Sequence, residues 1–259
     1  MLDLSTRPDQ AAAPACDTRQ RLDLYTPIHK ALRAFLSDTL VRVGALDAHH
    51  PQERADTCNQ VLALLEQMRR HLSHENAFIH EALERRSPGL CTAIAREHDH
   101  HLDSIADLGV LARALRDGDA KHADQLALRL YRHLADFTAE NFVHMREEET
   151  VINARLWSLF SDDDLSALHD RLLASIPPDE MALTLRWLVT ALSVPELTGL
   201  YGGMRDSAPA PVFVAMFDIA REHMQSERLA RLAGALGLWP LADPADGSTL
   251  RSPGPQSAE

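Results

Sequence analysis

Residues 61–75 read VLALLEQMRRHLSHE, and this stretch indicates how the chain folds. Its apolar residues recur every three or four positions, which is the period of an α-helix with one buried face. His71 and Glu75 continue that face, one helical turn apart. A second stretch, HMREE, places His144 and Glu148 in the same way on another apolar face. The sequence therefore predicts two helices that each turn a histidine and a glutamate inward.

Similar apolar stripes run through most of the chain, and the low aromatic content of 5% favours helix over strand. Long helices are expected near 26–47, 53–86, 90–117 and from there to about 159, and shorter ones near 162–175, 178–192, 194–205, 210–222 and 224–236. Four long amphipathic helices joined by short loops are typical of a bundle. The predicted fold is all-α: an up-down-up-down four-helix bundle followed by a smaller C-terminal helical region.

Proline and glycine mark the expected domain boundaries. Residues 1–20 and 240–259 are polar and proline-containing, which predicts a disordered N-terminus and a disordered tail. Residues 21–159 are assigned to the bundle and residues 160–239 to a C-terminal helical domain, which starts with a capping box at Ser161. That domain could dock a protein partner, although burial better explains its large apolar side chains.

The composition argues against several classes of function. The formal net charge is −12, which disfavours binding to nucleic acid or to an anionic membrane. The three cysteines show neither a disulfide framework nor CxxC spacing, which points to a reducing compartment. There is no signal-peptide pattern, and no apolar run approaches the roughly 18 residues of a membrane span. We therefore expect a cytoplasmic protein without a nucleic-acid or membrane partner.

The HxxxE spacing alone is a weak signal in a chain with 14 histidines. It occurs five times, at His49/Glu53, His71/Glu75, His80/Glu84, His144/Glu148 and His223/Glu227. The pairs at 71/75 and 144/148 lie on apolar stripes, whereas those at 49/53 and 80/84 are expected on the solvated surface. The pair at 223/227 lacks obvious partner ligands. Because a buried glutamate must be paired or bound to a metal, the two inward pairs predict a shared cation or a polar network.

The other two long helices add histidines at the same level. An antiparallel hairpin brings His29 level with His71, and residues 97–101 read EHDHH, in which both His98 and His101 can face the core. Imidazole and carboxylate donors suit iron, manganese or zinc rather than calcium. Two carboxylates that can bridge suit a dinuclear centre. The alternative is a polar core in which the histidines satisfy one another.

This ordered set resembles the hemerythrin-like (HHE cation-binding) family, whose pattern is a histidine, an HxxxE, a histidine and a second HxxxE on a four-helix bundle. The resemblance covers about residues 22–159. It implies a non-haem di-iron centre, two iron ions bridged by oxide or hydroxide, with the ligands His29, His71, Glu75, His98, His144 and Glu148. His101 then becomes an alternate ligand or an outer donor, and Tyr25 becomes a candidate proton donor near the iron.

The chain departs from the oxygen-carrying members of that family. Those have a second histidine on the third helix where this chain has Ile94, and their second carboxylate is an aspartate one residue further along. The resemblance therefore implies a di-iron protein that senses or binds a small ligand (oxygen, nitric oxide or peroxide) or responds to iron itself. The alternatives are a di-iron enzyme for peroxide or nitric oxide reduction or for iron–sulfur repair, and a helical interaction module with a structural metal. The sequence does not decide whether the protein is an enzyme.

Overall fold

The computed structural model describes residues 21–238. Helices joined by short connections make up this part of the chain, and no strand occurs within it. The all-α prediction is therefore confirmed. The predicted disorder of residues 1–20 and 240–259 concerns segments outside the described residues.

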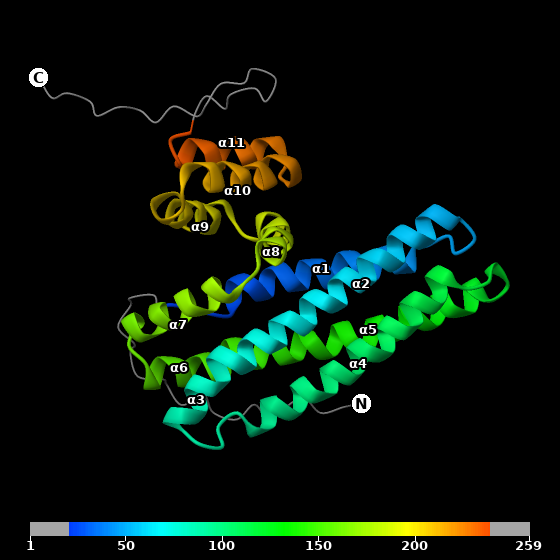
Figure 1. The fold of residues 1–259 in the computed structure, drawn as a ribbon, viewed down its shortest axis with the longest axis horizontal. Coiled ribbons are helices and arrows are strands. Elements are labelled where there is room, and N and C mark those ends of the chain that lie inside the picture. Colours follow the sequence, from blue (N-terminus) through cyan, green and yellow to red (C-terminus); the bar gives the residue numbers. More distant parts are fainter. Residues whose placement is uncertain (1–20, 239–259) are drawn as a thin grey trace, which may run out of the picture.

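Four long helices form the body of the molecule. They are α1 (Thr26–Gly44), α2 (Pro51–His74), α4 (Thr92–Asp117) and α5 (Ala123–Glu147), the last preceded by the short 3-10 turn η2 (Ala120–His122). In Figure 1 they lie side by side, and α1 and α4 each pack against both α2 and α5. Prolines in the first turns of α1 and α2 suit these starts, because proline lacks the N–H that would be unpaired there.

Two of the long helices pass into π-helical segments. The segment η1 (Glu75–His80) follows α2, and η3 (Glu148–Ile152) follows α5. The helices then continue as α3 (Glu81–Arg86) and α6 (Asn153–Leu159). A π turn takes in one more residue than an α turn, so it rotates the residues that follow it around the helix. Both segments begin at a glutamate of the predicted metal site.

The C-terminal part consists of five shorter helices. They are α7 (Asp162–Ser175), α8 (Pro178–Ala191), α9 (Val194–Ser207), α10 (Ala210–His223) and α11 (Ser226–Ala235), all within a few residues of expectation. The capping box at Ser161 is present. Helix α8 packs against α1, and α9 to α11 stand beyond it, away from the other long helices (Figure 1). Whether residues from 160 onward form a domain of their own stays a prediction.

The interior of the body contains two apolar clusters with a polar layer between them. One cluster includes Leu32 and Ile105, and the other includes Tyr25 and Ile94. The predicted ligands lie between these positions along each helix; on α1, for example, His29 falls between Tyr25 and Leu32. A layer of histidine and glutamate is thus enclosed on two sides by apolar side chains.

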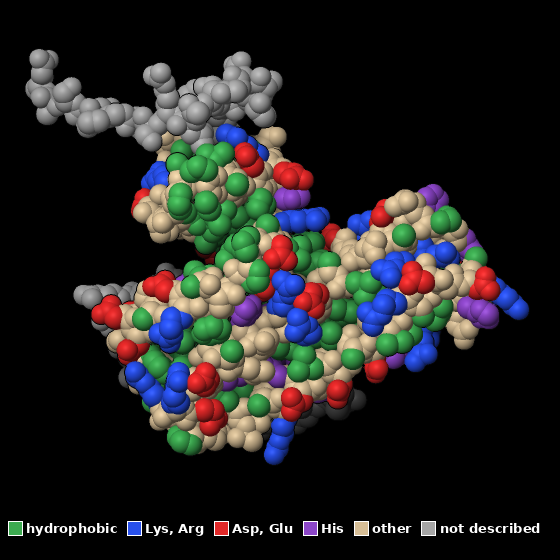
Figure 2. Space-filling model, viewed as in Figure 1, with side chains coloured by type: hydrophobic (Ala, Val, Ile, Leu, Met, Phe, Trp, Pro, Cys, Tyr) green, Lys and Arg blue, Asp and Glu red, His purple; other side chains and the backbone are tan. Residues whose placement is uncertain are grey.

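The surface carries charges of both signs. On the face shown in Figure 2, lysine and arginine side chains lie among aspartates and glutamates rather than in one basic area. Pairs such as Arg85 with Glu81 and Arg69 with Glu66 contribute to this mixing. Within residues 21–238, no helix has the length and apolarity needed to cross a membrane.

Candidate metal centre

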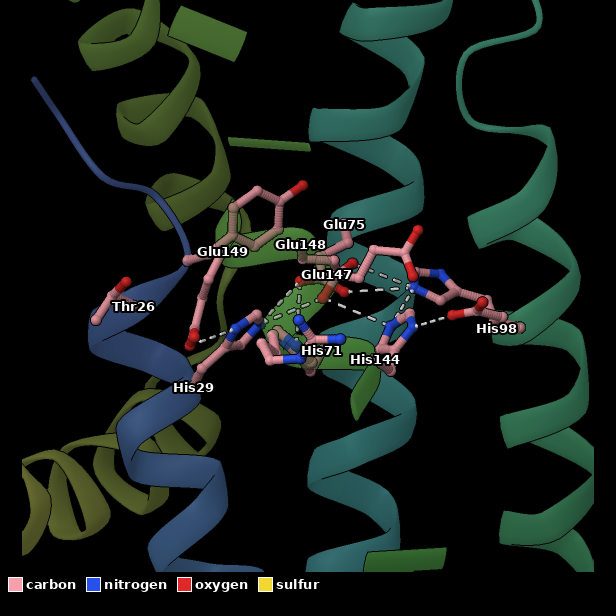
Figure 3. Close-up of polar contacts among 12 residues, drawn as sticks. Thr26, His29, His71, Glu75, His98, His144, Glu147, Glu148 and Glu149 are labelled. Atoms are coloured by element: carbon pink, nitrogen blue, oxygen red, sulfur yellow. Dashed lines mark hydrogen bonds and ion pairs between the residues drawn. The ribbon is translucent and has the colours of Figure 1, made fainter. Parts of the chain in front are cut away.

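Four helices bring the six side chains of the predicted site together. Figure 3 shows imidazoles from α1, α2, α4 and α5 converging on the two glutamates that begin η1 and η3. All six residues are at most 7% exposed: His29, His71, Glu75, His98, His144 and Glu148. Histidine and glutamate donors are therefore concentrated in one buried layer.

The donor atoms form two overlapping groups, and within each group the atoms lie within 4.8 Å of one another. Site A comprises His29, His71, Glu75 and Glu148; site B comprises Glu75, His98, His144 and Glu148. Each group could hold a metal ion. Because both glutamates belong to both sites, they are positioned to bridge two ions.

Glu75 directs its two oxygens to different sites. Its Oε1 lies 3.1 Å from His71 Nε2 and 3.5 Å from His29 Nε2, both in site A. Its Oε2 lies 3.7 Å from His98 Nε2 in site B. This split between the two sites is the arrangement that a bridging carboxylate requires.

Glu148 is shared in a similar way. Its Oε2 lies 3.4 Å from His29 Nε2 and 3.5 Å from His144 Nε2, and its Oε1 lies 3.5 Å from His98 Nε2. Within the described part of the chain, none of the four oxygens of Glu75 and Glu148 has a hydrogen-bond partner. Buried carboxylates in that state are costly unless a cation lies between them. The residues therefore fit a pair of metal ions.

Three of the imidazoles are held from outside the centre. His29 Nδ1 lies 3.2 Å from Glu149 Oε1, His144 Nδ1 lies 2.8 Å from Glu97 Oε2, and His98 Nδ1 lies 2.9 Å from Asn76 Oδ1. Oxygens at these positions favour the tautomer with the proton on Nδ1. The lone pair of Nε2 then faces inward, as in metal sites whose histidines donate their outer N–H to an oxygen.

The charge balance of the layer is set by burial and by the glutamates. Burial lowers the pKa of His29, but the carboxylates of Glu149 and Glu75 outweigh it and raise that pKa to about 9. Burial lowers the pKa of the neighbouring His71 to about 4. Burial also opposes the charge of Glu148, yet the histidines that face its oxygens, His80 and His98 first, keep its pKa well below the ordinary value. At neutral pH the protonated ring of His29 therefore faces the carboxylates of Glu75 and Glu148.

His98 and His101 differ in what they face. His98 belongs to site B, whereas His101, one turn further along α4, packs its ring 4.9 Å from that of His144 and 6.0 Å from that of Phe137. Burial lowers the pKa of His101 to about 4, so it is neutral at pH 7. The geometry favours His98 as the ligand from α4, with His101 behind His144.

Tyr25 lies beside site A. Its ring centroid is 5.4 Å from that of His29, its side chain is fully buried, and its hydroxyl has no hydrogen-bond partner among residues 21–238. Burial, followed by the charge of Glu148, raises the pKa of Tyr25 well above its ordinary value. The hydroxyl therefore keeps its proton, as the predicted role of a proton donor requires.

The prediction that His80 is a solvated surface residue is wrong. His80 is 4% exposed, its Nε2 lies 3.7 Å from Glu148 Oε1, and its ring stacks on that of His98. The physical reason is η1, because in a regular α-helix position 80 would lie off the face that carries Glu75, and the π turn brings it back. The surface prediction for His49 is confirmed.

Comparison with known families and with curated proteins found no matching family model and no matching protein. The hemerythrin-like resemblance therefore depends on the order of the four motif elements along the chain. The geometry of the layer gives independent reason to expect a metal centre, because it concerns donor atoms and burial rather than similarity of sequence.

Proposed function

We propose that this protein is a hemerythrin-like four-helix-bundle protein that holds two iron ions in sites A and B and binds a small ligand there. The observation that carries the proposal is the shared pair of buried glutamates, whose four oxygens lack hydrogen-bond partners within residues 21–238. Imidazole and carboxylate donors suit iron, manganese and zinc. The motif order of the hemerythrin-like family selects iron among them.

The packing of the long helices supports the bundle. Helices α1, α2, α4 and α5 follow one another through short connections, and each contacts two of the others. Metal sites in helical bundles are built from side chains that several helices direct into the core. Here all four long helices contribute a ligand, so the centre would also tie them together.

Donor counting supports a reactive centre rather than a saturated one. Four imidazoles and four carboxylate oxygens supply eight donors, against about twelve positions on two six-coordinate ions. Ferrous ions held by the residues of sites A and B would supply both electrons and a binding place for oxygen, nitric oxide or peroxide. The apolar clusters on either side of the layer favour a small uncharged ligand over a charged substrate.

The residues around the layer have defined tasks in this proposal. Glu149 accepts from His29 and is itself held by two nitrogens of Arg33, at 2.5 and 3.1 Å, so it fixes the ring that faces site A. Tyr25 keeps a proton on a buried hydroxyl beside that ring. A ligand arriving at site A would therefore find the hydroxyl of Tyr25 nearby as a hydrogen-bond donor.

The test is a metal analysis of anaerobically purified protein, with optical spectra before and after adding nitric oxide, oxygen or peroxide. We expect about two iron ions per chain, fewer in Glu75→Ala and Glu148→Ala, and an unchanged content in Glu140→Ala, which alters an exposed glutamate on α5. Full iron content in both site variants would refute the centre. Iron whose spectrum ignores all three ligands would leave a structural metal, and multiple turnovers of peroxide or nitric oxide would identify an enzyme.

A further inference from the structure

His80 meets the same conditions as the predicted ligands, although it belongs to neither group of donors described above. It is 4% exposed, and its Nε2 is buried without a hydrogen-bond partner among the described residues. That nitrogen lies 3.7 Å from Glu148 Oε1, the same oxygen that His98 Nε2 approaches at 3.5 Å. An unpartnered Nε2 directed at a shared carboxylate is also found in His29 and His71, the two imidazoles of site A.

We propose that His80 is a ligand of the ion in site B, an inference that rests on the proposed metal centre. Site B would then have three imidazoles, from His80, His98 and His144. Site A would have two, from His29 and His71. The centre would be asymmetric although its two carboxylates are shared.

Asn76 supports this role because one oxygen serves two histidines. Its Oδ1 lies 2.9 Å from His98 Nδ1 and 3.1 Å from His80 Nδ1. An amide oxygen only accepts, and it has two lone pairs, so both rings can donate to it from Nδ1. Each ring then presents the lone pair of Nε2 to the side of Glu148. This is the outer contact that orients histidines for metal binding.

The two rings are also held side by side. The centroids of His80 and His98 are 4.9 Å apart, and the ring planes differ by 30°. With their outer nitrogens on one oxygen and their inner nitrogens near another, the rings share both orientation and depth. The π turn is what permits this, because it returns position 80 to the face of Glu75 five residues earlier. His101, on the other side of His144, shows no comparable contact with a carboxylate within residues 21–238.

The asymmetry assigns the small ligand to one ion. The ion in site B would have one protein donor more than the ion in site A, since both glutamates face both sites. The larger number of free positions therefore lies in site A, next to His29 and the buried hydroxyl of Tyr25. A ligand that needs a proton donor would bind on that side.

The experiment uses the full chain, stripped of metal and titrated with Zn²⁺, with histidine labelled by ¹⁵N. Coordination moves the Nε2 resonance of an imidazole, so five histidine resonances should move if His80 is a ligand and four if it is not. The absence of one shifted resonance in His80→Gln assigns it. Chelator competition should show one ion bound at least about 10-fold more weakly in His80→Gln and the other unchanged. His100→Gln, a change at an exposed histidine of α4, should bind both ions like the wild type.

The outcomes separate the two proposals. A wild-type chain that binds no Zn²⁺ would overturn the metal centre and the His80 assignment with it. Two tightly bound ions with only four shifted resonances, and wild-type affinity in His80→Gln, would overturn the His80 assignment alone. If His80→Gln fails to fold, as judged by circular dichroism, the number of shifted resonances in the wild type still decides.

Discussion

The core of α8 to α11 and the layer of sites A and B are both buried, but a tyrosine hydroxyl in one is hydrogen-bonded and a tyrosine hydroxyl beside the other is not. Tyr201 is fully buried in the C-terminal core, and its hydroxyl donates to the carbonyl oxygen of Met216 at 3.0 Å. Tyr25 is equally buried beside site A, and its hydroxyl has no partner in the described chain. The buried hydroxyl of Tyr201 is hydrogen-bonded, as stability requires, whereas that of Tyr25 is not.

That difference is informative because buried polar groups are normally paired. Unpaired groups persist where a ligand or a reaction makes use of them, and local rules of folding fail most often at such places. Among the described residues, most of the unpaired atoms belong to Tyr25, Glu75, Glu148 and histidines of one layer, whereas in α8 to α11 the indole Nε1 of Trp187 is unpaired. The contrast with the C-terminal core can be tested region by region.

The largest expected effect is stabilisation of the layer by metal. A ligand that binds only the folded state at 1,000 times its Kd stabilises that state by about 4 kcal/mol. Zn²⁺ added to the metal-free protein should therefore raise the free energy of unfolding by that order and slow hydrogen exchange in α2 and α5. Denaturant titration and hydrogen exchange check this. Glu148→Ala should abolish most of the gain, and equal protection of α10 without protection of α2 would contradict the comparison.

The next largest effect concerns the proton on His29, which a metal ion must displace. The pKa of His29 is raised to about 9, so this imidazole is protonated at pH 7 and must lose its proton to bind an ion. A raised pKa in the folded state stabilises the metal-free fold fully below the unfolded pKa, near 6.5, and the benefit is lost as the pH rises through about 9. It amounts to roughly 3 kcal/mol.

Between these two pH values, metal-free stability should fall while metal affinity rises. Calorimetry at pH 7 in buffers of different ionisation enthalpy should show about one proton released per chain on metal binding. Glu149→Gln removes a carboxylate that raises the pKa of His29, so it should reduce the release. Unchanged release in that variant would show that the proton comes from elsewhere.

Sequence periodicity was sufficient for the helices and for the two inward histidine–glutamate pairs, whereas the choice of His98 over His101 came from the family resemblance. Apolar residues at helical spacing predicted the long helices and placed His71 and His144 on inward faces, and both are buried in the structure. His80 could not be found in this way, because a π turn is a pattern of backbone hydrogen bonds that the spacing of the apolar residues does not reveal. The contact of two rings with one oxygen of Asn76 could not be predicted either, because it brings together side chains from two helices.

The packing of the C-terminal helices on the body could not be predicted from the sequence either. Apolar stripes predict that α8 has a buried face but not that the face meets α1. In the structure the rings of Phe35 and Trp187 stack with centroids 4.2 Å apart, and Gln67 donates to Thr184 at 2.9 Å. Such contacts are fixed by the shapes of two distant segments together.

A moderate effect is therefore expected where the two regions meet. Trp187 is half-buried and stacks on Phe35, so Trp187→Ala should cost about 2 kcal/mol and loosen α8 to α11 from α1. Trp187→Phe keeps a ring on Phe35 and should retain most of the stability. Limited proteolysis and denaturant titration measure both. If Trp187→Ala weakens metal binding more than it weakens the attachment of α8, the two regions are coupled rather than merely adjacent.

The smallest expected effect concerns the hydroxyls of Tyr25 and Tyr201. Tyr201→Phe deletes the donor to Met216 and should cost about 1 kcal/mol, because it leaves that carbonyl with one hydrogen bond fewer. Tyr25→Phe removes a buried hydroxyl that has no partner within residues 21–238, so it should leave metal-free stability equal or slightly higher. Denaturant titration of both metal-free variants gives the two values. A loss of stability in Tyr25→Phe as large as that in Tyr201→Phe would mean that the Tyr25 hydroxyl is hydrogen-bonded in solution. The difference between the C-terminal core and the layer of sites A and B would then not hold at Tyr25.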